Sequence, residues 1–239
     1  MIREITSKSN DYIKELLKIK KSSKGAFLIE GSRFVGEAIK RGVRLKSLLF
    51  VDECDFCDGK CDCYRISPAI AESLSSTVSA SGVFALVDWG ESEFCQPKGD
   101  FLVLDNIQDP GNLGTIIRSA LSFGFCHIYL KNCVNWRNPK VLRSTMGTIF
   151  DVRLYEIDFN KFESLSKLPL YKADMVGENI FSFQRKEEII GLVLGNEANG
   201  ISPEVDRLVQ KSLSIPMQNN VESLNVAVAG AILMSKLAN

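Results

Sequence analysis

The stretch FLVLDNIQDPGNLGTIIR, residues 101–118, decides the fold of this chain. Its first four residues, 101–104, are apolar and bounded by polar ones, which is typical of a strand buried on both faces. The segment DPGN, residues 109–112, predicts a turn, because proline fixes φ, glycine tolerates positive φ and Asn112 can cap a helix. Apolar residues at helical spacing follow, so we expect Arg118 in the first or second turn of a helix. Ligand sites in open α/β sheets lie where strands end in this way.

Further strands of the buried type are predicted at residues 127–130, 170–173, 189–194 and 212–215, with helical segments between them. This alternation indicates a parallel α/β sheet. In the front part, short helices alternate with strands such as 47–51 and 82–87. A polar segment with Gly and Pro separates the two parts and predicts a linker. We therefore expect two domains, residues 1–88 and 101–239, joined by a linker at 89–100.

Composition indicates a globular protein that stays in the cytoplasm. The chain has 239 residues, of which 45% are hydrophobic, and this suffices for a sizeable core. Its start lacks the apolar run of a signal peptide, and its longest apolar stretch, residues 226–234, is shorter than the roughly 20 residues of a membrane span. We expect no membrane association. The seven cysteines are an odd number, and we expect reduced thiols.

The net charge of zero conceals an uneven distribution. Residues 1–50 contain 12 basic and 5 acidic residues, whereas residues 51–100 contain 3 basic and 10 acidic ones. Ten of these basic residues lie between residues 14 and 46, namely Lys14, Lys18, Lys20, Lys21, Lys24, Arg33, Lys40, Arg41, Arg44 and Lys46. They could neutralise the phosphates of a polyanion, or they could form an ordinary solvated surface. Charge alone leaves both interpretations open.

Two later segments repeat the arrangement of a strand followed by a polar turn. Residues 194–200, LGNEANG, follow a predicted strand, and their small side chains allow a ligand to approach the main chain. Ser202 and Pro203 predict the start of the next helix. Glu197 should lie at the same edge of the sheet as Arg118.

The third segment, residues 215–225, leads into a helix rich in small residues. Ser223 is its expected N-cap. The small residues Ala227, Ala229, Gly230 and Ala231 would allow close packing by another element of the same chain or by a partner subunit.

In this order and spacing, the three segments resemble the three motifs of the SpoU family of RNA ribose 2′-O-methyltransferases, in the SPOUT class. The first motif is represented by Asn106, Asp109, Pro110, Asn112, Gly114 and Arg118, the second by Leu194, Gly195, Glu197 and Gly200, and the third by Ile215, Pro216, Met217, Ser223, Leu224, Asn225 and Val226. The segment 143–147 is similar to the region that family members have between the first two motifs. Residues 27–31 and 74–83 resemble the small ribosomal-protein-L30e-like substrate-binding domain that many members carry.

The resemblance implies a parallel α/β methyltransferase domain with a deep trefoil knot near its C-terminus, and a homodimer built through that domain. It also implies that S-adenosylmethionine binds in the knotted loops. The residues implied for cofactor binding are Leu194, Gly195, Ile215, Met217 and Leu224, and those implied for catalysis are Arg118, Glu197, Ser223, Asn225 and Asn112. The expected substrate is structured RNA, with 23S rRNA favoured over tRNA. DNA is excluded as substrate because it lacks the hydroxyl group that would be methylated.

The residues themselves suggest how the reaction could proceed. Methyl transfer to a ribose hydroxyl is an in-line displacement, so the enzyme must align two partners and help the hydroxyl lose its proton. A guanidinium is a poor base, because it holds its proton firmly. We therefore hypothesise that Arg118 stabilises developing alkoxide character, and that Glu197, Ser223 and Asn225 arrange the hydrogen bonds around it.

Other candidate sites are weaker. His127, the single histidine, begins a predicted strand, where a structural or surface role is favoured over catalysis. The spacing of Cys54, Cys57, Cys61 and Cys63 differs from that of common zinc ribbons, and we predict no metal, although a metal site and a reduced loop both stay open.

A nicotinamide-dependent enzyme is excluded, because no G-x-G-x-x-G turn occurs in the sequence. A nucleotide-binding protein with a phosphate-binding loop is excluded because that loop is also absent from the sequence. The alternative function is a non-catalytic RNA-binding protein with a vestigial methyltransferase domain. The presence of Arg118, Glu197 and Asn225 speaks against it.

Overall fold

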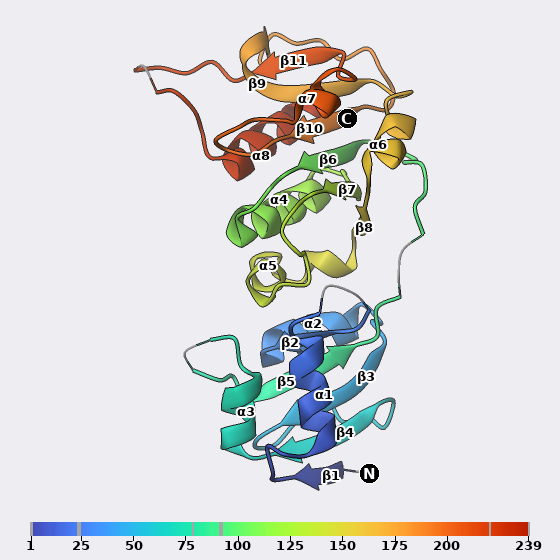
Figure 1. Cartoon of the computed structure of the whole chain (residues 1–239), viewed down its shortest axis with the longest axis vertical. Coiled ribbons are helices and arrows are strands. Elements are labelled where there is room, and N and C mark those ends of the chain that lie inside the picture. The colour runs from blue at the N-terminus through green and yellow to red at the C-terminus, as the bar shows by residue number, and fades with distance from the viewer. Residues whose placement is uncertain (1, 23–24, 78, 91–92, 220, 239) are drawn as a thin grey trace. The chain divides into compact units, whose positions relative to one another are not determined.

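The computed structural model describes residues 2–22, 25–77, 79–90, 93–219 and 221–238. The chain forms two compact units (Figure 1). The first comprises Met1–Glu91 together with Arg137–Phe150, and the second comprises Ser92–Trp136 together with Asp151–Asn239. Each unit has its own sheet and its own hydrophobic core.

The first unit contains a mixed sheet of five strands. In the order across the sheet these are β1 (Ile2–Ile5), β4 (Asp62–Ile66), β3 (Leu45–Phe50), β5 (Val83–Val87) and β2 (Phe27–Glu30). Its helices are α1 (Asp11–Ile19), α2 (Ser32–Lys40), α3 (Pro68–Leu74) and α5 (Pro139–Ser144), followed by the 3-10 helix η1 (Thr148–Phe150). Strand β4 is parallel to both its neighbours, and β5 is antiparallel to both its neighbours. The apolar face of α1, with Ile13 and Leu16, packs with α3 in the core of this unit.

The second unit contains six strands, all parallel, which confirms the predicted parallel sheet. In the order across the sheet these are β11 (Lys211–Ser214), β9 (Leu170–Asn179), β10 (Gly191–Leu194), β6 (Phe101–Asp105), β7 (His127–Lys131) and β8 (Arg153–Glu156). Its helices are α4 (Pro110–Ser122), α6 (Phe159–Leu165), α7 (Pro203–Asp206) and α8 (Val226–Leu237). Every residue of β6 is buried, as expected for a central strand of a parallel sheet.

Several strand boundaries differ from the prediction for local reasons. Strand β10 begins at Gly191 rather than at residue 189, since the amide of Ile190 donates to the Asp100 carboxylate at 3.0 Å. Strand β9 continues to Asn179, and its exposed second half pairs with β11 after a shift in register. Strand β8 is absent from the predicted set, because only its two middle residues are buried and its sequence shows no apolar run.

The predicted helix caps need two corrections. The N-cap of α4 is Asp109, whose carboxylate accepts a hydrogen bond from the Asn112 amide at 2.8 Å, so the prediction of Asn112 as cap was wrong. Helix α4 therefore starts at Pro110, and Arg118, as its ninth residue, lies in the third turn rather than in the first or second. The N-cap of α8 is Asn225 and not Ser223, because the Asn225 side chain accepts from the Ala227 amide at 2.9 Å. The cap at Ser202 is confirmed by its position before α7, without a side-chain hydrogen bond.

The small residues of α8 allow close packing within the chain. A Cβ atom added at Gly230 would lie 2.7 Å from the Leu194 Cδ1 atom of β10. Helix α8 also contacts α4 and β9. Of the two alternatives that the sequence left open, packing in the same chain is confirmed.

The order of the strands places the three motifs at one edge of the second sheet. Strands β7 and β8 lie on one side of β6, and β10, β9 and β11 lie on the other (Figure 1). The direction of the connections therefore changes between β6 and β10, and ligands of open α/β sheets bind outside the carboxyl ends of strands at such a point. The first motif follows β6 and the second follows β10. Among the described residues, no helix combines the length and the apolarity that a membrane crossing requires.

A buried ion pair holds the opposite edge of this sheet together. The Arg185 guanidinium donates to both carboxylate oxygens of Asp100, at 2.6 and 2.7 Å, and to the Leu237 carbonyl oxygen at the end of α8. The two side chains are 10% and 11% exposed. Removal of one partner leaves a buried charge without compensation, so breaking such a pair is strongly destabilising.

We expect Arg185→Met to lower the free energy of unfolding of the second unit by about 3 kcal/mol, because the Asp100 carboxylate would stay buried without its cation. Urea denaturation measures this change. Lys211→Met is the matched control, because the ion pair of Lys211 with Glu178 is about half exposed and such pairs contribute at most about 1 kcal/mol. Equal effects of the two substitutions would refute this assignment.

Candidate active site

Three polar side chains from the three motifs form a hydrogen-bonded chain at this edge. Asn112 Nδ2, in the first turn of α4, donates to Glu197 Oε1 in the loop after β10. Asn225 Nδ2, at the start of α8, donates to Asn112 Oδ1 at 2.9 Å. Asn112 thus connects the second motif to the third. Because Asp109 caps the helix, the side chain of Asn112 is available for these two contacts.

The loop after β10 is a tight turn that requires glycine at two positions, Gly195 and Gly200. Asn196 and Gly200 exchange two backbone hydrogen bonds of 2.9 Å, and Gly200 has a φ of +66°. A Cβ atom added at Gly195 would lie 2.5 Å from the Ile201 amide nitrogen, closer than real Cβ contacts. Asn196 Nδ2 donates to the Asn106 carbonyl oxygen at 3.1 Å, which attaches the start of the loop to the first motif.

A cavity of about 800 Å³ opens beside this loop. Its walls come from the middle of β9, the loops after β10 and β11, and the start of α8. Its size is within the range of small-molecule and cofactor sites. Of the predicted cofactor-binding residues, Gly195, Ile215, Met217 and Leu224 line it. Leu194 is fully buried in β10 and packs against Gly230 instead.

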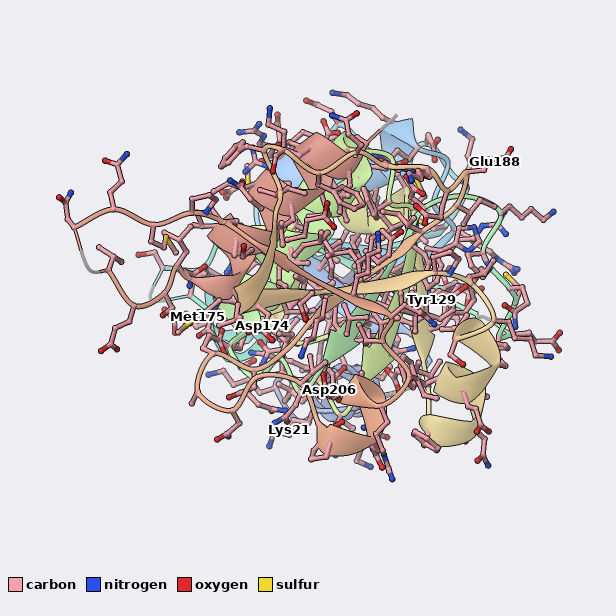
Figure 2. All side chains as sticks on the ribbon, turned by 90° about the horizontal axis from the view of Figure 1, so that it is seen from above. Lys21, Tyr129, Asp174, Met175, Glu188 and Asp206 are labelled. Atoms are coloured by element: carbon pink, nitrogen blue, oxygen red, sulfur yellow. The ribbon has the colours of Figure 1, made fainter. Side chains whose placement is uncertain are left out.

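One wall of the cavity carries charged residues that the sequence did not predict. Lys172 lies between Asp174 and Asp206, with N–O distances of 2.9 and 2.7 Å, and all three line the cavity. Asp174 belongs to β9 and Asp206 to α7 (Figure 2). The hydrogen bond with Asp206, followed by that with Asp174, raises the pKa of Lys172 above its ordinary value, so it stays protonated at neutral pH. The sequence contains one hint of this cluster, because the charged Lys172 directly follows the two apolar residues that begin β9.

Two predicted catalytic residues, Ser223 and Arg118, lie outside the hydrogen-bonded chain of Asn112, Glu197 and Asn225. Ser223 is exposed and lines the cavity, but no hydrogen bond joins it to Glu197 or Asn225 among the described residues. Arg118 is exposed on α4, six residues after Asn112, and points about 120° away from it around the helix axis. Within the described part of the chain, the guanidinium has neither a hydrogen bond nor an ion pair. The catalytic network around Arg118 therefore stays a prediction.

The comparison with known proteins identifies the family. The sequence profile of the SpoU rRNA Methylase family matches residues 100–235. The chain belongs to this family. The profile of the MRM3-like substrate binding domain matches residues 10–85. The family matches and the relatives described below confirm the predicted family. They also confirm an RNA methyltransferase activity with S-adenosylmethionine as methyl donor.

The SpoU assignment agrees with individual relatives. The 23S rRNA (guanosine(2553)-2′-O)-methyltransferase RlmP of Bacillus subtilis is 28% identical, over 99% of this chain and 99% of its own length. An RNA methyltransferase structure from Porphyromonas gingivalis, assigned to the TrmH family, has a TM-score of 0.84 and 30% identity, covering 95% of this chain and 97% of that one. The SpoU methyltransferase AviRb of Streptomyces viridochromogenes, solved with AdoMet, shares the fold with a TM-score of 0.84 at 21% identity, over 96% and 97% of the two chains.

His127 lies away from this SpoU site. It is the first residue of β7, at the amino edge of the sheet, and is 9% exposed. Its ring stacks on that of Tyr155 with 6.0 Å between centroids. Burial, and secondarily the charge of Arg153, lowers the pKa of His127, which favours the neutral ring. These contacts give His127 a packing role.

The cysteine-rich loop of the first unit contains reduced thiols. Cys54, Cys57, Cys61 and Cys63 are all free. Burial, and then the neighbouring Cys63 thiol, raises the pKa of Cys57 to about 12 and that of Cys61 to about 11, so both stay protonated at neutral pH. In the described part of the chain, no group of three or more histidine, cysteine or acidic residues is arranged to hold a metal ion. The expectation of no metal stays a prediction.

Ion pairs neutralise about half of the predicted basic surface of the first unit. Lys14 pairs with Asp11, Lys40 and Arg41 pair with Glu37, and Arg44 and Lys46 pair with Asp88. Lys20 donates to the Ser75 carbonyl oxygen at 2.5 Å. Lys24 lies outside the described residues. Of the predicted basic residues, Lys18, Lys21 and Arg33 are exposed and have no ion pair among the described residues.

Proposed function

We propose that this enzyme transfers the methyl group of S-adenosylmethionine to a ribose 2′-hydroxyl, with 23S rRNA favoured over tRNA as substrate. The hydrogen-bonded chain of Asn112, Glu197 and Asn225 carries this proposal, because it joins the three SpoU motifs beside a cavity of suitable size. The name of the Bacillus subtilis relative, a 23S rRNA 2′-O-methyltransferase, supports both the ribose hydroxyl and the RNA class.

The residues around the cavity fit the cofactor. Gly195 lines the cavity and, having no side chain, offers only main-chain atoms to a ligand there. We assign cofactor binding to Gly195, Ile215, Met217 and Leu224, and to Leu194 a supporting position behind the wall. The cofactor supplies an electrophilic methyl group on a sulfonium when it is bound.

Arg118 and the motif residues perform different tasks in this scheme. Held by the residues of the cavity wall, the cofactor would supply the methyl group to the ribose oxygen, and the ribose hydroxyl would lose its proton to solvent. Arg118 stabilises the negative charge that develops on the oxygen, since its guanidinium stays charged and offers several N–H donors. Asn112, Glu197 and Asn225 hold the three motif loops together, and Ser223 completes the cavity wall.

The same proposal includes the deep trefoil knot. Strand β11 lies at the edge of the sheet, and the chain runs outward after it before α8 returns to pack on α4 and β10 (Figure 1). This return to the interior supports a knotted path. Such paths are rare in proteins, so the family resemblance carries much of this inference. A crystal structure with a continuous backbone trace tests it.

Exposed apolar residues support a homodimer formed through the second unit. Met175 is 68% exposed, Val176 82%, Phe181 57% and Val228 48%. Large exposed apolar patches are typical of interaction surfaces, and a dimer interface would cover these side chains. Sedimentation equilibrium should therefore report twice the mass of the chain, and the mass of a single protomer would contradict the dimer.

The first unit supplies the RNA-binding part of the proposal. We assign residues 1–88, an L30e-like domain, to substrate binding, residues 89–100 to a linker and residues 101–239 to the catalytic domain, although the segment Arg137–Phe150 of the latter belongs to the first compact unit. The unpaired cations Lys18, Lys21 and Arg33 are available for RNA phosphates. We propose the cytoplasm as the location and RNA, without DNA or membrane, as the partner.

Methylation of defined RNAs tests the proposed function. We expect the purified protein with radiolabelled S-adenosylmethionine to label 23S rRNA transcripts, with the label in an alkali-resistant 2′-O-methyl nucleotide. tRNA and a DNA copy of the labelled region serve as matched substrates and should stay unlabelled. Label in a base, or in tRNA alone, would overturn the substrate assignment.

A further inference from the structure

A buried lysine lies at the carboxyl end of β7, next to the first motif. Lys131 follows the apolar residues of β7, and its side chain is 4% exposed. Asp105 ends β6 and is directly opposite Lys131 in the strand register, with a side chain that is 1% exposed. Two charges are therefore buried side by side at the edge of the sheet that carries the active site.

The side chains of Lys131 and Asp105 both contact residues at the start of α7. Lys131 Nζ lies 3.3 Å from Asp105 Oδ1, 2.5 Å from Glu204 Oε1 and 3.4 Å from Ser202 Oγ. The Ser202 amide donates to Asp105 Oδ2 at 2.6 Å. We call these four residues, Asp105, Lys131, Ser202 and Glu204, the Lys131 cluster.

Together, the acidic neighbours of Lys131 affect its pKa more than burial of its ammonium group does. Burial alone would lower the pKa of Lys131, but the hydrogen bond with Glu204 and the charge of Asp105 raise it above its ordinary value. The side chain is therefore a cation at neutral pH. Buried ion pairs of this kind serve specificity of structure rather than net stability in several proteins.

The Lys131 cluster attaches the far end of the loop that carries the second motif. The loop begins at Gly195, where Asn196 donates to the Asn106 carbonyl oxygen, and ends at Ser202, where the cluster holds the backbone. Both attachments connect to the end of β6. With its ends fixed to the same strand, the loop presents Glu197 to Asn112 in one position.

We propose that Lys131 is a positioning residue that, together with Asp105, fixes the start of α7 and thereby holds Gly195 and Glu197 in the geometry that binds the cofactor. This inference rests on the proposed role of that loop. None of the residues in the cluster lines the cavity, so the action is indirect.

Three variants test this proposal. In Lys131→Met, we expect the dissociation constant of S-adenosylmethionine to rise between about tenfold and a hundredfold, as for misplaced binding groups. The KM for the cofactor should rise more than kcat falls. Lys131→Arg keeps a cation with several donors and should recover part of the affinity. Lys211→Met, which removes a half-exposed lysine of the same unit, should leave the affinity unchanged.

Hydrogen exchange of the cofactor-free protein supplies a readout that does not depend on activity. Amides of residues 195–202 should exchange faster in Lys131→Met than in the parent protein, while those of β6 stay protected. Should Lys131→Met fail to fold, the double variant Asp105→Asn with Lys131→Met removes both buried charges and is measured in its place.

Unchanged affinity together with unchanged exchange in a folded variant would overturn the role of Lys131. A chain that binds the cofactor but methylates no ribose would instead contradict the proposed function, and would leave these measurements interpretable.

Discussion

Replacing Arg118 with alanine is expected to lower kcat for methyl transfer by at least about a hundredfold, the effect of removing one donor from a developing oxyanion. The dissociation constant of S-adenosylmethionine should stay within about twofold, because Arg118 does not line the cavity. Single-turnover methylation of RNA measures the first quantity, and titration calorimetry without RNA measures the second.

Two further variants separate the role of Arg118 from that of a general surface charge. Arg153 is also an exposed arginine of the second unit, but it starts β8 at the amino edge of the sheet. Arg153→Ala should therefore keep the parental rate. Arg118→Lys retains the charge but not the planar fork of donors, and we expect it to recover only a small part of the rate. A rate in Arg118→Ala equal to that of Arg153→Ala would remove Arg118 from the reaction.

The part of the fold that the sequence predicted correctly depends on local patterns. Residues 101–104 are uniformly apolar because β6 is covered on both faces, and the same holds for residues 128–130 of β7. Parallel strands share one carboxyl edge, so the residues after β6 and β10 could be placed together without coordinates. The contact of Asn112 with Glu197 follows from this placement.

The part that could not be predicted depends on competition between neighbouring groups. In residues 109–112, both Asp109 and Asn112 are suitable helix caps, and the sequence does not say which side chain reaches a free amide first. The same ambiguity concerns Ser223 and Asn225 before α8. In both cases the cap determines which side chain remains for the active site.

The burial of the charged residues Lys131 and Asp105 could not be predicted from sequence patterns either. Lys131 and Asp105 are single polar residues at the ends of apolar runs, where an exposed position is the usual outcome. Their burial depends on Ser202 and Glu204, which lie about 70 residues after Lys131 and about 100 residues after Asp105. Only the strand order, with β6 between β7 and β10, brings these residues together.

Replacing Gly195 with alanine should abolish cofactor binding, with a loss of affinity of at least about a hundredfold. The added Cβ atom would lie 2.5 Å from the Gly200 carbonyl oxygen and from the Ile201 amide nitrogen, and backbone atoms cannot move aside as the end of a flexible side chain can. The turn between Asn196 and Gly200 must then open, which displaces both the cavity wall and Glu197. Titration calorimetry with S-adenosylmethionine measures the loss.

Gly99→Ala is the matched control for this substitution. It adds the same methyl group in the same unit, but a Cβ atom at Gly99 has no neighbour within 4 Å. Its cofactor affinity should equal that of the parent protein. Thermal unfolding of Gly195→Ala distinguishes a displaced loop, which lowers Tm by a few degrees, from loss of the fold. If folded Gly195→Ala binds the cofactor as tightly as Gly99→Ala does, the loop after β10 does not form the cofactor site, because its backbone cannot accept the methyl group without moving.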